Sequence, residues 1–235
     1  MAVTGIALIL FLTFHCCMNI VALFSGEAYN MICEMLGANW YAVAATVGLA
    51  ALAVCHIVFA FILTAQNRRA RGENRYEVST TVNSNGLSDV AERWASGNML
   101  VLGFIILGGL LLHLWNFWYN MMFAELVGMP TKLNPADGFG WIQETFASPW
   151  FAGLYLVWFA AIWFHLAHGF WSAMQTLGVS GKIWHKRWNC IGLIYVSLLM
   201  LGFTVVVLAF AFGCAPSLCC ENGAGCCQAA AACCN

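Results

Sequence analysis

Residues 39–64 read NWYAVAATVGLAALAVCHIVFAFILT, an apolar run without a single Asp, Glu, Lys or Arg. A helix needs about 20 such residues to cross the hydrocarbon core of a bilayer. The run therefore predicts a transmembrane helix. One histidine, His56, lies inside it.

Four further runs of similar character make the whole chain an expected all-α integral membrane protein, a five-helix bundle. Hydrophobic residues make up 62% of the 235 residues and charged residues only 8%, whereas a soluble domain carries about 25% charged residues. The net charge of -1 includes no basic stripe that would attract nucleic acid. We expect the spans at Gly5–Phe24, Asn39–Thr64, Met99–Phe123, Trp150–Thr176 and Asn189–Phe212.

Basic residues are retained in short cytoplasmic loops, so their positions predict the orientation of the chain. Eight of the nine Lys and Arg residues follow the second or fourth span, and only Lys132 falls on the opposite side. We therefore expect a cytoplasmic N-terminus and a C-terminus on the outer side. The eight residues are Arg68, Arg69, Arg71, Arg75, Arg93, Lys182, Lys186 and Arg187.

The segments between the spans are too small to form a catalytic domain. Residues 66–98 predict a polar connector able to meet a soluble partner, and residues 125–149 predict an irregular or interfacial segment. We divide the chain into a membrane domain, residues 1–213, and a Cys-rich tail outside the membrane, residues 214–235. Seven of the twelve cysteines lie in the tail. Disulfides that include Cys33, a metal cluster and a disordered tail all remain open.

Histidines occupy four successive spans: His15, His56, His113, and the pair His165 and His168. Ionisable side chains inside a membrane are costly and rare, so each is a functional candidate. A single membrane histidine is more often a hydrogen bond between helices than a ligand. Four in consecutive helices favour ligation of a metal or a haem.

The depth of each histidine in its span predicts which of them meet. At a rise of about 1.5 Å per residue, His56 lies roughly 12 Å and His165 roughly 14 Å from the cytoplasmic ends of their helices. By the same rise, His113 lies roughly 21 Å from that end, and His15 about 15 Å or deeper. We therefore pair His56 with His165, and His15 with His113.

Two histidines that face each other from different helices at one level are typical axial ligands of a single haem iron. A zinc site prefers three or four ligands at one depth, and the staggered depths disfavour it. Because no CxxCH attachment motif is present, we expect non-covalent haem of b type. Four glycines lie near the histidines: Gly103, Gly108, Gly109 and Gly169. They would let the backbone approach a flat macrocycle closely, or they simply allow the helices to pack closely.

Five short motifs along the chain carry a family resemblance. They are Met1-Ala-Val-Thr-Gly5, Gly26-Glu-Ala-Tyr-Asn30, Thr64-Ala-Gln-Asn-Arg-Arg-Ala-Arg71, His113-Leu-Trp-Asn-Phe-Trp118 and His165-Leu-Ala-His-Gly-Phe-Trp-Ser172. From Met1 to about Phe212, the sequence resembles the di-haem cytochrome b subunit of type B succinate dehydrogenases and fumarate reductases. It departs from the family in its Cys-rich tail and at Gly97, where an arginine is expected. The family has residues before the first motif, so we expect the natural chain to begin upstream.

The resemblance implies two haems b in a subunit of the bacterial cytoplasmic membrane, with a periplasmic C-terminus, that exchanges electrons with menaquinone. It also implies two cytoplasmic partners, a flavoprotein with FAD and an iron-sulfur protein, which interconvert succinate and fumarate. Carried over residue by residue, His56 and His165 would ligate the haem proximal to the iron-sulfur subunit, and His15 and His113 the distal haem. His168 is then a propionate contact, an alternative ligand or a packing residue.

In this family the quinone reacts toward the outer face, where an acidic residue of the first outer loop handles its proton. Glu27 and Glu34 are the carboxylates available there, and we expect them to be the proton acceptors, with Glu27 ranked first because it lies in the Gly26–Asn30 motif. Two solvated loop acids are the alternative interpretation.

Two other functions remain open at the level of sequence. One is a di-haem cytochrome b that serves a hydrogenase or a formate dehydrogenase. The other is a haem-free transporter that uses the histidines as a proton relay. The direction of the reaction and a dimer of the whole complex are also left open.

Overall fold

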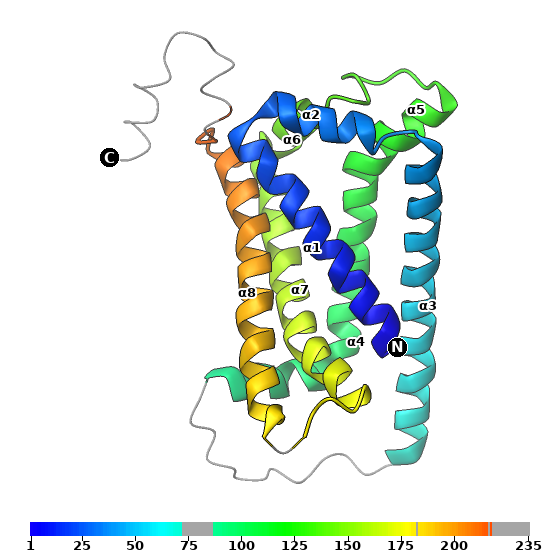
Figure 1. Ribbon diagram of the computed structural model, residues 1–235, viewed down its shortest axis with the longest axis vertical. Coiled ribbons are helices and arrows are strands. Elements are labelled where there is room, and N and C mark those ends of the chain that lie inside the picture. The colour runs from blue at the N-terminus through cyan, green and yellow to red at the C-terminus, as the bar shows by residue number, and fades with distance from the viewer. Residues whose placement is uncertain (72–86, 182, 216, 218–235) are drawn as a thin grey trace.

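The computed structural model describes residues 1–71, 87–181, 183–215 and 217 (Figure 1). Within these residues the regular elements are all helices. Five of them are long and apolar enough to cross a membrane, which confirms the expected all-α, five-span bundle. The elements are α1 Ala2–Phe24, α2 Gly26–Met35, α3 Trp40–Arg71, α4 Leu87–His113, the π-helix η1 Leu114–Phe123, α5 Ala124–Val127, α6 Gly138–Phe146, α7 Pro149–Thr176 and α8 Trp184–Ala211.

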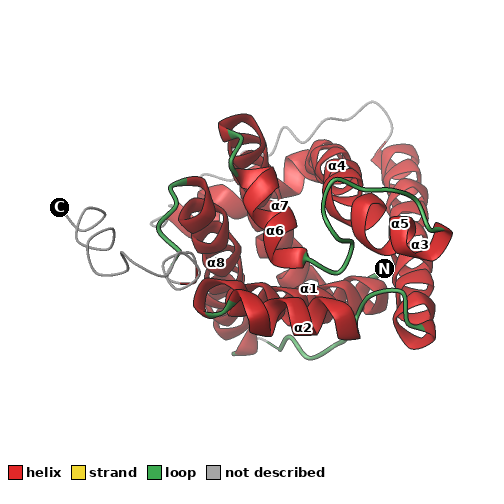
Figure 2. Ribbon diagram, turned by 90° about the horizontal axis from the view of Figure 1, so that it is seen from above, coloured by secondary structure: helices red, strands yellow, loops and turns green. Residues whose placement is uncertain are grey.

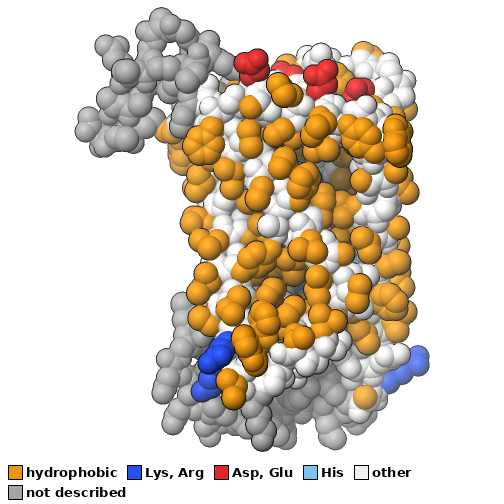
Figure 3. Space-filling model, viewed as in Figure 1, with side chains coloured by type: hydrophobic (Ala, Val, Ile, Leu, Met, Phe, Trp, Pro, Cys, Tyr) orange, Lys and Arg blue, Asp and Glu red, His pale blue; other side chains and the backbone are white. Residues whose placement is uncertain are grey.

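The molecular surface has the pattern of a membrane protein. On the face shown in Figure 3, hydrophobic side chains form a broad belt, with Lys and Arg at one end and Asp and Glu at the other. Trp40 and Trp150, which begin α3 and α7 at the acidic end, are 81% and 82% exposed. Tryptophan is enriched where a membrane meets water. These side chains therefore mark one boundary of the apolar belt.

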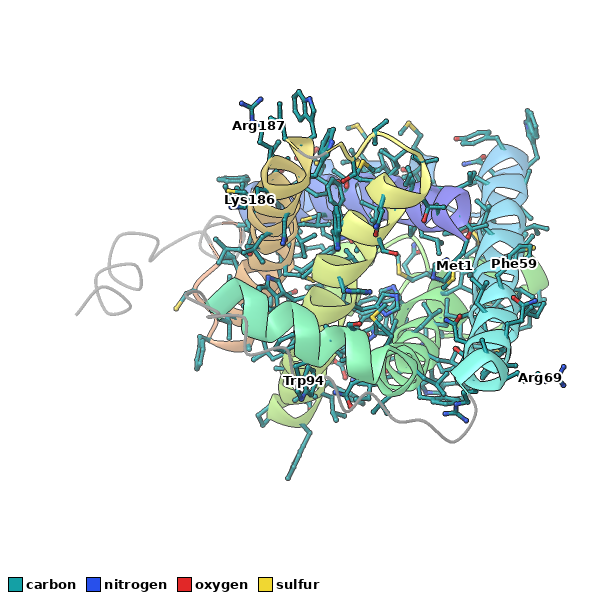
Figure 4. The ribbon with its side chains drawn as sticks, turned by 90° about the horizontal axis from the view of Figure 1, so that it is seen from below. Met1, Phe59, Arg69, Trp94, Lys186 and Arg187 are labelled. Carbon is teal, nitrogen blue, oxygen red and sulfur yellow. The ribbon has the colours of Figure 1, made fainter. Side chains whose placement is uncertain are left out.

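The predicted connector, residues 66–98, is helical at both of its ends, which the sequence analysis did not expect. α3 continues past Thr64 to Arg71, and α4 already begins at Leu87. Gln, Arg and Ala are good helix formers, so the backbone of α3 stays helical beyond the apolar run. Figure 4 shows the first part of α4, around Trp94, lying across the end of the bundle. Residues 72–86 lie outside the described part.

The opposite end is capped by the short helices α2, α5 and α6 (Figure 2). Ser25 and Asp137 cap α2 and α6, because each side chain accepts a backbone N–H of the first turn. Asn30 joins the two helices: its amide donates to Asp137 at 2.8 Å, and its oxygen accepts the N–H of Phe139 at 2.8 Å. The predicted irregular segment, residues 125–149, therefore contains an ordered interfacial helix.

α7 and α8 pack closely against each other, with α8 at the edge of the bundle opposite α3, and α1 crosses the bundle obliquely (Figure 1). Val196 and Val207 of α8 are fully buried in the core. α1 packs against α8, α7 and α3, whereas α3 has α1 as its main partner. No residue in the most apolar window of α3 is buried. α3 therefore stands apart from the other helices and leaves its apolar side chains open to lipid or to a bound apolar group.

Candidate functional site

The first pair of histidines comes from α1 and the end of α4. The ring centres of His15 and His113 lie 5.8 Å apart, with an angle of 82° between the ring planes. Phe11 stacks on His15 at 5.5 Å. Phe117 and Trp158 lie 5.2 and 5.7 Å from His113. The two imidazoles therefore face each other inside an aromatic shell.

A π-helical turn begins directly after His113. In η1 the side-chain amide of Asn120 donates to the carbonyl oxygens of Trp115 and Asn116, at 2.9 and 3.1 Å. Such turns are rare and occur frequently at functional sites. Here the turn carries Asn116, which is 8% exposed, into the interior beside the pair.

Tyr155 of α7 links this pair to that buried amide. Its hydroxyl lies 3.5 Å from His113 Nδ1, and Asn116 Nδ2 donates to the same hydroxyl at 3.4 Å. Tyr155 is only 3% exposed. The polar chain from Asn116 to His113 is therefore shielded from lipid and water and can orient the imidazole.

The second pair comes from α3 and α7. The ring centres of His56 and His165 lie 6.3 Å apart, with an angle of 64° between the ring planes. Thr4 Oγ1 of α1 lies 3.1 Å from His56 Nδ1. α1 thus contributes one histidine to the first pair and one hydroxyl contact to the second.

The distance within each pair suits one shared metal ion. A bond between a metal and an imidazole nitrogen is about 2 Å long, and the nitrogen lies about 1 Å from the ring centre, so two rings on one ion are about 6 Å apart. Both observed distances match this value. In the part of the chain that the structure describes, no three His, Cys, Asp or Glu side chains converge on one point. The histidine side chains are therefore arranged as two separate pairs.

One imidazole of the second pair has a ring nitrogen without a hydrogen-bond partner in the described part of the chain. His165 Nδ1 is buried and has no hydrogen-bond partner among the described residues. An unpaired buried nitrogen costs free energy that a ligand removes. The main helix partner of α3 is α1, and His56 meets His165 of α7 across the bundle. The donor set, two imidazoles in each pair, fits a haem held by each pair of histidines.

The four glycines near the histidines divide into two kinds. A Cβ built on Gly109 would overlap the ring of Trp158, so this glycine permits close packing of α4 on α7. A Cβ built on Gly103, Gly108 or Gly169 meets nothing within 4 Å. Gly109 is therefore a packing residue, and the other three border open space.

His168 lies one turn beyond His165 on α7, within electrostatic reach of it. The structure pairs His56 with His165 by ring contact. His168 therefore lies beside this pair. Its role is either to contact a bound group or to pack between the helices.

The two candidate carboxylates occupy different positions on α2. Both are exposed, but only Glu34 lines a surface pocket of about 530 Å³ at the acidic end. Glu125 of α5 lines the same pocket, and its carboxylate accepts the N–H of Ala38 at 3.2 Å. No motif in the sequence singled out Glu125. The structure thus brings Glu34 and Glu125 together and leaves Glu27 outside the pocket.

Cys33 is a free thiol in the described part of the chain. It packs between Tyr29 and Gly138, and a Cβ on Gly138 would overlap its sulfur. Burial raises the pKa of the Cys33 thiol to about 11. A protonated thiol is a poor nucleophile. The tail cysteines beyond Cys214 lie outside the described residues, and so do the alternatives of disulfides, a metal cluster or disorder that the sequence left open for them.

Besides Glu125, sequence reasoning missed Thr4 and Tyr155, which contact the histidines. Thr4 precedes His15 by eleven residues, about three turns of helix, so both lie on one face. That periodicity was an available signal for Thr4. Tyr155 contacts a histidine of another helix, and only tertiary packing reveals such a contact.

No family model, curated protein or solved structure matches this chain. The site is therefore defined by the chain's own residues and distances. What these establish is a five-span helical membrane protein in which four histidines from four spans meet in two pairs.

Proposed function

We propose that this chain is the di-haem cytochrome b membrane anchor of a type B succinate:quinone oxidoreductase. The observation that carries the proposal is the meeting of four membrane histidines in two pairs, with ring centres 5.8 and 6.3 Å apart. His56 and His165 would hold the proximal haem b, and His15 and His113 the distal one. When bound, the haems supply reversible one-electron transfer across the bilayer.

The protein contributes orientation and exclusion of water at the two pairs. Phe11 and Phe203 lie against His15, at 5.5 and 5.9 Å. Trp158 lies against His113 and is fixed in turn, because its indole N–H donates to Ile106 O at 3.0 Å. An apolar shell and hydrogen bonds to the ligands are the means by which a protein sets a haem potential.

The basic end of the bundle supports a cytoplasmic position for the N-terminus. Arg69 of α3, and Lys186 and Arg187 of α8, lie at the rim of this end (Figure 4). Positive charge is retained on the cytoplasmic side of bacterial membranes. In the proposed complex the iron-sulfur protein and the FAD-containing flavoprotein dock here, beside the first part of α4. The C-terminus is then periplasmic.

The acidic end supports a quinone site on the outer side. The pocket beside Glu34 and Glu125 opens at this end. In the direction of fumarate reduction, oxidation of a menaquinol bound there would release two electrons, for which the haems would be the acceptors, and two protons, of which the Glu34 carboxylate would accept one. Glu27 was ranked first from the sequence, but it is exposed and lies outside the pocket, so we place Glu34 first.

The proposal is tested by the composition and activity of the complex purified from the native membrane through this chain. We expect one flavoprotein and one iron-sulfur protein to co-purify, with electron transfer from a menaquinol analogue to fumarate. Co-purification of a hydrogenase or a formate dehydrogenase instead would assign the same haem sites to another oxidoreductase. Absence of any soluble partner and of haem would leave the transporter as the remaining function.

A further inference from the structure

Thr4 lies where the first turn of α1 meets α3. Its Oγ1 is 3.1 Å from His56 Nδ1 and 2.8 Å from the carbonyl oxygen of Met1. A Cβ built on Gly5 would lie 3.5 Å from His56 Cε1, an ordinary contact distance. The first turn of α1 therefore packs against the imidazole of His56.

The proton of the Thr4 hydroxyl fixes the direction of both hydrogen bonds. A carbonyl oxygen only accepts, so the bond to Met1 uses the single hydroxyl proton of Thr4. The contact with His56 then requires that Nδ1 carry a proton and donate it to a lone pair of Thr4 Oγ1. A neutral imidazole protonated at Nδ1 keeps its lone pair on Nε2, which is then the metal-binding nitrogen.

For His113 and His165, the described contacts do not fix the position of the ring proton in this way. The hydroxyl of Tyr155 lies 3.5 Å from His113 Nδ1 and accepts a hydrogen bond from the Asn116 amide, which leaves the direction of the bond to His113 undecided. His165 Nδ1 has no hydrogen-bond partner among the described residues. The tautomer is thus specified most clearly at His56.

We propose that Thr4 is a positioning residue that holds His56 in the Nδ1–H tautomer and so presents its Nε2 lone pair to the iron of the proximal haem. A hydrogen-bond partner on the far nitrogen makes a ligating imidazole more basic, and its loss lowers metal affinity by about 10- to 100-fold. The role of Thr4 in haem binding rests on the proposed function, whereas the tautomer of His56 does not.

Three variants of the full chain in its complex test the role in haem binding. Thr4→Val keeps the side-chain shape without the hydroxyl, and Thr4→Ser restores the hydroxyl. Thr13→Val is the matched control, since Thr13 lies on the same helix and its hydroxyl donates to Ile9 O at 2.8 Å and contacts Tyr195, not a histidine. The measurements are the loss of each haem to an excess of apo-globin and the midpoint potential of each haem.

We expect Thr4→Val to weaken binding of the His56 haem by about 10- to 100-fold and to raise its midpoint potential, because a less basic ligand stabilises ferric iron less. Thr4→Ser and Thr13→Val should behave as wild type. Unchanged haem loss and potential in Thr4→Val, or the same change in Thr13→Val, would overturn the proposal.

A second measurement separates this proposal from the function on which it rests. The ¹⁵N NMR spectrum of the histidine-labelled full chain, purified in detergent without haem, reports which ring nitrogen carries the proton. The signals of His56 are assigned as those missing from the spectrum of the His56→Ala variant. We expect a protonated Nδ1 in wild type and a shift toward protonated Nε2 in Thr4→Val. If His56 Nδ1 is unprotonated in wild type, the proposed role of Thr4 is wrong, even if both haems bind. If His56 Nδ1 is protonated but the chain never takes up haem, the hydrogen bond between His56 and Thr4 is supported and the proposed function is wrong.

Discussion

Two adjacent glycines of α4 provide a matched pair of substitutions. In Gly109→Ala the new methyl group overlaps the indole of Trp158, which cannot move freely because its N–H donates to Ile106 O at 3.0 Å. Overpacking costs about 1–3 kcal/mol, the loss of the hydrogen bond about 1 kcal/mol, and the better helix propensity of alanine returns about 1 kcal/mol. The net expected destabilisation is about 1–3 kcal/mol.

Gly108→Ala is the control, because a Cβ at Gly108 meets nothing within 4 Å. Its only expected effect is the gain in helix propensity of about 1 kcal/mol. The two variants therefore differ by about 2–4 kcal/mol, or about 5–15 °C in Tm for a chain of this size. Thermal unfolding in detergent, followed by circular dichroism, measures the difference.

The cost of Gly109→Ala should shrink in a Trp158→Phe background, since the smaller ring leaves space for the methyl group. Because Trp158 also lies 5.7 Å from His113, we expect Gly109→Ala to alter the spectrum of the distal haem alone. Equal Tm values for Gly108→Ala and Gly109→Ala would refute the described packing of α4 on α7.

Three further predictions concern the proton acceptor, the distal ligand and the outer cap. Glu34→Gln should slow menaquinol-linked fumarate reduction in a steady-state assay at least tenfold more than Glu27→Gln, because only Glu34 lines the outer pocket; equal rates would remove Glu34 from the proton path. Tyr155→Phe removes the hydroxyl beside the Nδ1 atom of His113 and should shift the midpoint potential of the distal haem in a redox titration while leaving the other unchanged. Burial raises the pKa of Cys33 to about 11, so its thiolate fraction, and with it the rate of maleimide labelling, should rise about tenfold per pH unit from pH 7 to pH 10; fast labelling at pH 7 would contradict its burial.

The five spans were predictable because a bilayer imposes one simple requirement on sequence, an apolar run of about 20 residues. Asn39–Thr64 meets this requirement, and α3 covers it. The helical continuation of α3 to Arg71 was not predicted, since charged residues end an apolar run without ending a helix. The outer helix α6 was missed for a related reason. Its nine residues give a short pattern, and its position depends on contacts with Asn30 of a distant segment.

The pairing of His56 with His165 was predictable from depth, because a helix converts residue number into height with a constant rise. His15 and His113 were paired because they remained, and the structure places them side by side, as it does His56 and His165. The contact of Tyr155 with His113 depends on the rotation of α7 about its own axis, which residue number does not specify. The same limit applies to Glu125, which reaches the pocket of Glu34 from another segment of the chain.

The most direct test of the proposed function is haem quantitation with a reduced-minus-oxidised spectrum of the purified complex, in wild type and in single histidine variants. We expect two b haems per chain in wild type. His113→Ala should remove one haem and His56→Ala the other, whereas His168→Ala should retain both. A chain without haem, or with a haem content that neither His113→Ala nor His56→Ala changes, would contradict the assignment of the two pairs as haem ligands.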